Sequence, residues 1–250
     1  MNELSLNEPA GVLVKTTCVD YPGILAGSFF LKGCNIRCPY CYNTGLVLGK
    51  DDGTQPLNTV QELFDHLEKR QGILKGLTVS GGEPLLNPYT PLIIRKAKEL
   101  GYLVKLDTNG TLPDELEVFI TNPELRPDFI AMDIKTAPSR YAEVICPAFS
   151  KYHGKAEHFE HVLKRSATLV ASYPPDQREW RTVLVPPLVQ KSDIEAMATI
   201  LPKDASWQFA QFMNQNCIDP SYNEIYPYTD QEAQGLIQYA QTFIKKSELR

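Results

Sequence analysis

The sequence predicts an α/β fold in the form of a partial (β/α)6 TIM-like barrel, with a parallel sheet, outer helices and one open side. Apolar segments rich in β-branched and aromatic residues alternate with segments of helical periodicity along most of the chain. The alternation makes about six strand–helix units, whereas a closed barrel of this type needs about eight. No linker rich in Pro, Gly and Ser interrupts it, so we expect a single domain over residues 1–250.

Each element of this fold is expected from its own pattern. The expected strands are residues 24–31, 74–79, 102–106, 129–134, 180–185 and 206–212. The expected helices are residues 59–70, 91–100, 113–120, 158–171, 193–201 and 230–246. Asn58 and Ser192 are the expected N-caps of two helices, and Pro91 and Pro113 fit the first turns of two others.

Composition and charge narrow the possible functions. The 25 basic and 30 acidic residues leave a net charge of -5, and no basic stripe is present, so nucleic-acid binding is disfavoured. The first residues lack the basic start and apolar run of a signal peptide, and no segment reaches the roughly 20 apolar residues of a membrane span. We therefore expect a soluble, cytoplasmic protein that does not contact a membrane.

Polar motifs follow the expected strands. The cysteine group at residues 34–41 follows the first strand, SGGEP at 80–84 follows the second, DTNG at 107–110 follows the third, and DIK at 133–135 ends the fourth. The chemistry of parallel sheets covered by helices belongs at the carboxyl ends of the strands. We therefore expect all four motifs on one rim of the sheet.

Two connections are longer than the few residues that usually join neighbouring elements. They span about residues 42–58, after the cysteines, and about residues 136–157, after DIK. Both should emerge on the rim that carries the motifs, so a lid or a docking surface is favoured. Surface decoration is the alternative interpretation.

Cys34, Cys38 and Cys41 are spaced so that one tight loop can bring their thiolates together. Soft sulfur ligands select zinc or an iron–sulfur cluster. A structural zinc ion needs a fourth ligand, and the loop contains no His. A [4Fe–4S] cluster on three cysteines leaves one iron open for an external ligand, so iron–sulfur is favoured and zinc stays the alternative. The isolated cysteines are interpreted as small buried apolar residues: Cys18, Cys146 and Cys217.

These motifs carry a family resemblance. CNIRCPYC, with an aromatic Tyr40 before the third cysteine, resembles the loop of radical S-adenosylmethionine (SAM) enzymes, as do GGEP, DTNG and DIK. TCVDYPG, GYLVKLDTNG and PDFIAMDIK are similar to the branch that activates glycyl-radical enzymes, and most closely to the anaerobic ribonucleoside-triphosphate reductase activating proteins. The resemblance covers residues 11–136 well, and residues 181–187 and 211–222 more loosely.

The resemblance implies a radical SAM oxidoreductase whose cofactors carry the difficult chemistry, so no side chain is assigned a catalytic role of its own. Cys34, Cys38 and Cys41 would bind one [4Fe–4S] cluster, and the absence of cysteine from residues 42–80 argues against a second. An electron from a flavodoxin-like or ferredoxin-like donor would cleave SAM to a 5′-deoxyadenosyl radical. That radical would generate a glycyl radical on a partner enzyme, expected to be anaerobic ribonucleoside-triphosphate reductase.

The resemblance also implies which residues bind the cofactor. The glycine-rich motif would receive the ammonium of SAM, the lysine of DIK its carboxylate, and the aromatic residue of the cysteine loop its adenine. Strand-end oxygens of DTNG and DIK would hold a monovalent cation. Apart from the resemblance, an ordinary turn, a surface lysine and helix capping explain the same residues. The candidate cofactor-binding residues are Tyr40, Gly81, Gly82, Glu83, Asp107, Thr108, Asn109, Asp133, Lys135 and Arg181.

The sequence departs from the family pattern at two places. Tyr42 follows the third cysteine, where many relatives carry His. The segment QFAQFMNQN lacks the His with which some relatives bind the ribose. Three other functions stay open: activation of another glycyl-radical enzyme of the pyruvate formate-lyase type, radical modification of a small molecule or peptide, and a zinc-stabilised binding protein without catalysis.

Overall fold

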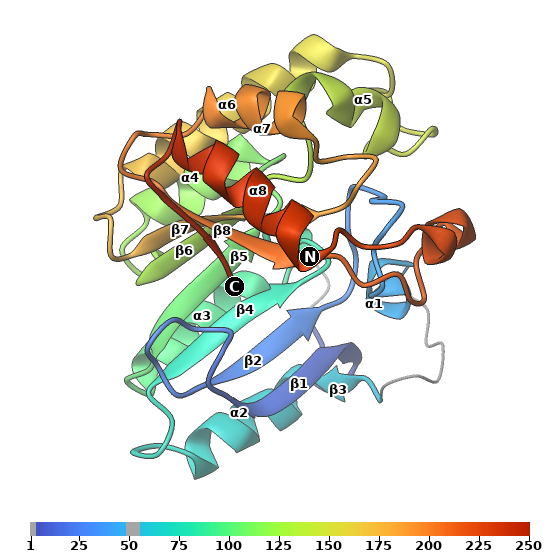
Figure 1. Ribbon diagram of the computed structural model, residues 1–250. Helices are drawn as coiled ribbons and strands as arrows, with labels where there is room; N and C mark the ends of the chain where they lie inside the picture. The colour runs from blue at the N-terminus through green and yellow to red at the C-terminus, as the bar shows by residue number, and fades with distance from the viewer. Residues whose placement is uncertain (1–3, 49–55) are drawn as a thin grey trace. The chain divides into compact units, whose positions relative to one another are not determined.

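Strands and helices alternate along the chain, as the periodicity predicts (Figure 1). The computed structural model describes residues 4–48 and 56–250. The strands are β1 (Pro9–Thr17), β2 (Ala26–Leu31), β3 (Asn58–Thr59), β4 (Gly76–Gly81), β5 (Leu103–Thr108), β6 (Phe129–Asp133), β7 (Arg178–Leu184), β8 (Ser206–Gln211) and β9 (Lys246–Leu249). The α-helices are α1 (Thr44–Leu48), α2 (Val60–Lys69), α3 (Thr90–Glu99), α4 (Pro113–Thr121), α5 (Tyr141–Val144), α6 (Ala156–Ala171), α7 (Lys191–Ala198) and α8 (Asp230–Gln241). The 3₁₀ turns are η1 (Pro84–Leu86), η2 (Pro138–Arg140) and η3 (Pro220–Glu224).

The sheet is open and mostly parallel. Its strands follow the order β3-β1-β2-β4-β5-β6-β7-β8-β9, so β3 and β9 are its two edges. β4 pairs in parallel with β2 and β5, and β8 pairs in parallel with β7 and β9. β1 pairs antiparallel with β2 and with β3. The predicted fold class, an open α/β sheet with outer helices, is confirmed.

The chain divides into two compact units. The first unit comprises Met1–Asn35, Thr44–Thr108 and Glu115–Ile130, and the second comprises Ile36–Asn43, Asn109–Asp114 and Ala131–Arg250. The expectation of a single domain over the whole chain stays a prediction.

The first unit buries its strands on both faces. Adjacent residues of a strand point to opposite faces, and Ser28 and Phe29 of β2, like Thr78 and Val79 of β4, have no exposed surface. Helix α2 packs on β1 and α3 on β5. Strands buried on both faces read as continuous apolar runs rather than as alternating patterns, which is why β2 and β4 are recognisable in the sequence.

The second unit is built around aromatic residues of β7 and β8. Trp180, Trp207 and Phe209 are fully buried, and the rings of Trp207 and Phe209 lie with their centroids 4.6 Å apart. The indole Nε1 of Trp207 donates to the hydroxyl of Thr182 at 3.0 Å, which satisfies this buried donor. Helix α8 packs on α7 and β9.

All six expected strands and all six expected helices are present within a few residues of their expected bounds. The strands β1, β3 and β9 are additional to the expected set. The expected helix over 230–246 ends at Gln241, and Lys246 begins β9. The residues of β9 have no strand-like alternation of their own, and they form a strand because they pair in parallel with β8.

Both expected N-caps are wrong by one or two residues. Thr59 caps α2: its hydroxyl accepts from Glu62 N, and the Glu62 carboxylate accepts from Thr59 N at 2.7 Å. Asn58 instead belongs to β3, where its Oδ1 accepts from Leu13 N at 3.0 Å. Gln190, not Ser192, is the N-cap of α7. Pro91 and Pro113 do lie in the first turns of α3 and α4.

The two long connections contain short helices. The first carries α1, and its residues 49–55 lie outside the described part of the chain. The second carries η2 and α5 before α6 begins at Ala156. Their interpretation as a lid or a docking surface stays a prediction.

The loop after β4 lies directly against the loop after β2 within the first unit. Gly82 N donates to Leu31 O at 2.8 Å, and Glu83 N donates to Gly33 O at 2.8 Å. Gly81 has φ 123°, a left-handed conformation that favours glycine. A Cβ on Gly82 would stand 2.0 Å from Gly33 O. Only glycine therefore permits this approach to the peptide that leads into Cys34.

We expect Gly82→Ala to lower the free energy of unfolding by about 1–3 kcal/mol, because the new methyl group forces the two loops apart. Gly235→Ala is the matched control, since Gly235 lies in α8 and a Cβ added there would meet no atom within 4 Å. The control should raise the free energy of unfolding by about 0.5–1 kcal/mol. Urea denaturation measures both, and equal stability of the two variants would contradict the close approach.

Candidate functional site

Three strand ends of the first unit carry the residues that the sequence singles out. β2 and β5 both run parallel to β4, so their carboxyl ends meet at one edge of the sheet. Cys34 follows β2, Gly82 follows β4, and Asp107 and Thr108 are the last residues of β5. The expected common rim is therefore present for the motifs of this unit.

Glu83 is a fully buried carboxylate at this rim. Its Oε1 accepts from the hydroxyl of Thr108 at 3.0 Å and from Leu85 N at 3.1 Å. The first bond links the end of β5 to the loop after β4, and the second caps η1. Glu83 thus caps a 3₁₀ turn and also places a buried carboxylate at the rim.

Asp107 is paired by residues outside the set of candidates. Its Oδ1 accepts from Lys105 Nζ at 2.5 Å, and its Oδ2 accepts from the hydroxyl of Ser80 at 2.9 Å. The family resemblance implies a monovalent cation beside this carboxylate, which stays a prediction; within the first unit the ammonium of Lys105 contacts the carboxylate. The sequence does contain a signal that Lys105 pairs with Asp107, because residues two apart on a strand point to the same face.

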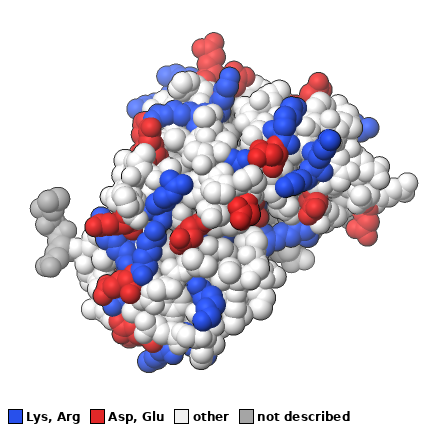
Figure 2. Space-filling model, turned by 90° about the vertical axis from the view of Figure 1, so that its left-hand side faces the viewer, with Lys and Arg blue, Asp and Glu red and all other residues white. Residues whose placement is uncertain are grey.

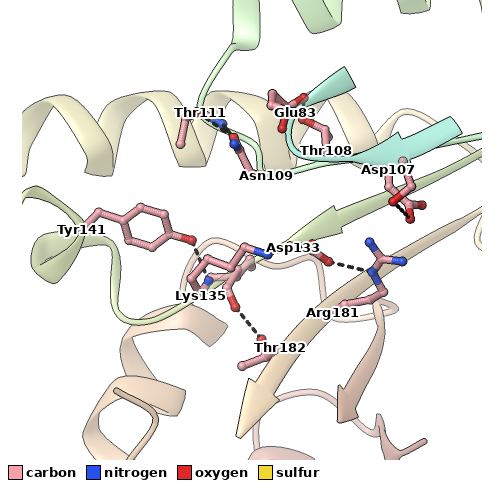
Figure 3. A network of polar contacts seen from close by, with 12 residues as sticks. Glu83, Asp107, Thr108, Asn109, Thr111, Asp133, Lys135, Tyr141, Arg181 and Thr182 are labelled. Atoms are coloured by element: carbon pink, nitrogen blue, oxygen red, sulfur yellow. Dashed lines mark hydrogen bonds and ion pairs between the residues drawn. The ribbon is translucent and has the colours of Figure 1, made fainter. Parts of the chain in front are cut away.

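In the second unit Asp133 lies between two cations, as Figure 3 shows. Its Oδ1 accepts from Arg181 Nε at 2.6 Å, and its Oδ2 accepts from Lys135 Nζ at 2.8 Å. Burial disfavours the ionised carboxylate, but Arg181 and Lys135 outweigh it and hold the pKa of Asp133 well below its usual range. The three residues together carry a net positive charge.

The backbone around Lys135 is fixed on both sides. Lys135 N donates to the hydroxyl of Tyr141 at 2.6 Å, and Ile134 N donates to Arg181 O at 2.8 Å. The Thr182 hydroxyl donates to Ile134 O at 2.9 Å. Burial disfavours the charged ammonium, yet Asp133 and then Cys38 raise the pKa of Lys135 above its usual range. Lys135 is therefore a positioned cation rather than a solvated surface lysine.

The cysteine loop of the second unit is held by its backbone. Cys41 N donates to Cys38 O at 3.0 Å, which closes a turn. Arg37 N donates to Ile145 O at 2.9 Å, and Ile218 N donates to Cys41 O at 3.0 Å. Burial raises the pKa of the Cys41 thiol, while a backbone hydrogen bond from Asn43 and the charges of Lys135 and Arg37 lower it. Segments after β6 and after β8 thus shape the loop.

Tyr40 lies in the same loop and is 6% exposed. Its ring packs edge-on against Phe212, with centroids 6.3 Å apart and an interplanar angle of 87°. Burial raises the pKa of the Tyr40 phenol well above its usual value. Within the described part of the chain, its buried hydroxyl has no hydrogen-bond partner. Tyr42, which replaces the His of many relatives, is 53% exposed.

Asn109 shapes the turn after β5. Its Oδ1 accepts from Thr111 N at 3.0 Å and from the Thr111 hydroxyl at 2.7 Å. Gly110 follows with φ 74°, and a Cβ on it would stand 2.3 Å from Cε of Met132. These contacts of Asn109 are those of a side chain that stabilises a turn after a strand. The candidate residues are therefore divided between the two units. The chain passes from the first unit to the second between Thr108 and Asn109, and also between Cys34 and Cys38.

The isolated cysteines follow their expectation in part. Cys146 and Cys217 are buried, whereas Cys18 is exposed and the interpretation of it as a core residue is wrong. All six cysteines lie in the described part of the chain, and none is in a disulfide. Among residues 4–48 and 56–250, no three His, Cys, Asp or Glu side chains are grouped to hold a single metal ion.

Basic and acidic side chains are interspersed on the face drawn in Figure 2, rather than gathered by sign. No helix in the described ranges is long and apolar enough to cross a membrane. The expectation that the chain does not bind nucleic acid stays a prediction.

Three relatives show what the chain is similar to in sequence. The chain is similar to a proposed glycyl-radical enzyme activating enzyme of Methanocaldococcus jannaschii, with 29% identity over 239 residues, 95% of this chain and 94% of that protein. A pyruvate formate-lyase-activating enzyme of Staphylococcus aureus is 32% identical over 123 residues, 47% of this chain and 49% of that protein. A 7-carboxy-7-deazaguanine synthase of Aquifex aeolicus is 29% identical over 160 residues, 59% of this chain and 70% of that protein.

A solved structure supports the fold. TYW1 with a lysine–pyruvate adduct bound has a TM-score of 0.59 and 13% identity, over 91% of this chain and 78% of that one. The first two relatives confirm the resemblance to the activating branch, while the nearer resemblance to the reductase activating proteins stays a prediction. The sequence profile of the Radical SAM superfamily matches residues 28–199, more than half of the chain. The chain therefore belongs to the Radical SAM superfamily, whose enzymes use a [4Fe–4S] cluster and SAM.

Proposed function

We propose that this chain is an activase that generates a glycyl radical on a partner enzyme, and that the partner is anaerobic ribonucleoside-triphosphate reductase. The observation that carries the activase function is the similarity, along 95% of the chain, to the proposed activating enzyme. The choice of partner is supported by TCVDYPG and the other motifs that resemble the reductase activating proteins. A [4Fe–4S] cluster held by Cys34, Cys38 and Cys41 would supply the one electron that cleaves the sulfonium–ribose bond of SAM, and the adenosyl radical released would take a hydrogen atom from a glycine Cα of the partner.

We assign the [4Fe–4S] cluster to Cys34, Cys38 and Cys41. Backbone hydrogen bonds hold the peptides around these residues, so the shape of the loop does not depend on the thiols. A cluster of this type attaches each cysteine to a different iron, and its three sulfurs need not converge on one point as the ligands of a single zinc ion must. The donor set therefore fits the cluster, with one iron left for SAM.

We assign the carboxylate of SAM to Lys135 and Arg181. Each donates to Asp133, so both cations are held in place beside that carboxylate. Positioned Lys and Arg side chains favour an anionic ligand group. The positive ammonium of SAM is assigned to Gly81, Gly82 and Glu83, because Glu83 is a buried carboxylate beside backbone that only glycine can supply.

We assign the adenine of SAM to Tyr40 and the turn at Asn109. An unpaired buried hydroxyl costs about 1–3 kcal/mol, so the Tyr40 hydroxyl favours a ligand that supplies its missing partner. The Asn109 side chain accepts from Thr111 N and so fixes the turn directly after β5, which is why Asn109 is included in this assignment. No residue of this chain is proposed as the general acid or base of the reaction.

A protein substrate is favoured by exposed apolar side chains around the cysteine loop of the second unit. Phe149 is 81% exposed and lies 5.9 Å from the Arg37 guanidinium, and Tyr226 is 86% exposed in the segment after β8. Tyr42 and Met213 are both more than half exposed. Exposed aromatic side chains beside a site are typical of protein–protein contacts. They fit a glycine loop presented by a partner enzyme.

A second candidate function is the radical modification of a small molecule. It is favoured by the similarity to 7-carboxy-7-deazaguanine synthases over 59% of this chain. For either function we propose a flavodoxin-like or ferredoxin-like electron donor. We also propose a cytoplasmic location, because six cysteines outside any disulfide suit a reducing compartment.

We expect Cys34→Ala, Cys38→Ala and Cys41→Ala each to abolish formation of an intact cluster, because each removes one of its thiolate ligands. Anaerobic reconstitution with iron and sulfide, followed by iron and sulfide analysis and visible absorption, measures cluster content. Cys146→Ala is the control and should retain the wild-type content, since this buried thiol belongs to no ligand set. Equal losses in all four variants, or tight stoichiometric zinc in place of the cluster, would contradict the assignment.

Tyr40→Phe should leave the stability of the SAM-free protein unchanged or raise it by up to about 1 kcal/mol, because the hydroxyl that it removes has no partner. The same variant should weaken SAM binding by about fivefold to tenfold. Tyr102→Phe is the matched control: its buried hydroxyl donates to Leu67 O at 2.6 Å, so the control should lose about 1 kcal/mol and keep its SAM affinity. Unchanged SAM affinity in Tyr40→Phe would remove Tyr40 from the site.

The function itself is tested by mixing the reduced, reconstituted protein with SAM and a candidate partner. With anaerobic ribonucleoside-triphosphate reductase, we expect 5′-deoxyadenosine by chromatography and a glycyl radical signal by electron paramagnetic resonance. The control is the same reductase with its radical-forming glycine replaced by alanine, which should give no signal. A signal only on pyruvate formate-lyase would contradict the proposed partner. Formation of 7-carboxy-7-deazaguanine with no glycyl radical on any partner would overturn the activase function.

A further inference from the structure

Lys105 is a buried cation to which the proposed function gives no task. Its side chain has no exposed surface, and its Nζ lies 2.5 Å from Asp107 Oδ1 and 5.9 Å from the centre of the Phe129 ring. A lysine is almost never fully buried unless it is paired. All these residues belong to the first unit. The ammonium therefore lies against a carboxylate that ends a strand at the candidate site.

The geometry of β5 explains this placement. Lys105 and Asp107 are two residues apart, so their side chains leave the strand on the same face. Ser80, on the neighbouring strand β4, donates to the other oxygen of Asp107 at 2.9 Å. Removing one member of a buried pair leaves an uncompensated charge, which is strongly unfavourable. The carboxylate and the ammonium thus depend on each other.

The family resemblance gives Asp107 a different partner, a monovalent metal ion that Thr108 and Asp133 would share. In this chain each of the two carboxylates already has a cation of the protein within hydrogen-bond distance: Lys105 at Asp107, and Lys135 and Arg181 at Asp133. A metal ion placed on Asp107 would stand close to a fixed ammonium, and like charges in a poorly solvated place repel strongly. The residues present therefore do not fit a metal ion at Asp107.

We propose that the Lys105 ammonium is the resident cation of Asp107, and that SAM binding by this chain consequently needs no added monovalent metal ion. Lys105 is then a positioning residue that holds the Asp107 carboxylate at the end of β5. The proposal rests on the proposed function, in which SAM binds at this rim. Unlike that function, it predicts how different salts affect the affinity for SAM and how substitutions change the melting temperature of the protein without cofactor.

The first test uses the reconstituted wild-type protein. Its dissociation constant for SAM is measured at constant ionic strength in choline, sodium, potassium and ammonium chloride. We expect values that agree within about twofold. Binding that is tenfold or more tighter in potassium or sodium than in choline would overturn the proposal. Absence of SAM binding in every salt would instead reject the proposed function, and the stability measurements below would still decide the role of Lys105.

The second test removes the ammonium. In Lys105→Ala we expect SAM binding in choline to weaken by about tenfold, and potassium or ammonium to restore it, because a small cation can enter the vacated space beside Asp107. Lys75→Ala, which truncates an exposed lysine of the same unit, is the control and should show neither change. Salt-independent binding of wild-type affinity in Lys105→Ala would make the ammonium irrelevant to SAM and overturn the proposal.

The third test needs no cofactor. Thermal unfolding of the metal-free chain should show a lowered melting temperature for Lys105→Met, and a recovery of most of that loss in Lys105→Met/Asp107→Asn, because the double variant removes both charges of the pair. Ammonium chloride should raise the melting temperature of Lys105→Ala more than choline chloride does. Additive losses in the double variant would contradict the pairing. If the single variants fail to fold, recovery in the double variant and the wild-type salt series still decide the proposal.

Discussion

Two backbone hydrogen bonds, from Gly82 to Leu31 and from Glu83 to Gly33, are the contact on which the candidate site of the first unit depends. They join the loop after β4 to the peptide that leads into Cys34, with no room for a side chain between them. The Glu83 carboxylate then accepts from Thr108 and so connects a third strand end. The proposed cluster ligand Cys34, the buried carboxylate of Glu83 and the end of β5 are thereby connected through rigid backbone, as a well-ordered site requires.

A second feature of the molecule is the compensation of strand-end carboxylates by basic side chains. The carboxylates that end β5 and β6 are both paired with cations of the protein, Asp107 with Lys105 and Asp133 with Lys135 and Arg181. The pairing of Asp107 with Lys105 fixes the end of β5. The Lys135 and Arg181 cations held by Asp133 are the ones proposed to receive the carboxylate of SAM.

The sequence predicts the strands that carry the site because they are buried on both faces and end in recognisable polar motifs. It predicts less well what depends on pairing between distant segments. β9 becomes a strand only beside β8, and Thr59 replaces Asn58 as a helix cap because Asn58 is engaged by β1. The pattern of apolar residues does not single out Lys105, because a lysine inside an apolar run resembles an exposed residue of a strand. The signal for its burial is Asp107, which lies two positions later on the same face of β5.

The central claim is that Cys34, Cys38 and Cys41 hold a [4Fe–4S] cluster whose fourth iron binds SAM directly. Electron–nuclear double resonance on the reduced, reconstituted protein tests it with SAM that is labelled with ¹⁵N in its amino group and ¹⁷O in its carboxylate. We predict hyperfine coupling of both nuclei to the cluster, of a size that requires direct bonds to iron. A reduced cluster that binds labelled SAM without coupling to either nucleus would contradict the claim.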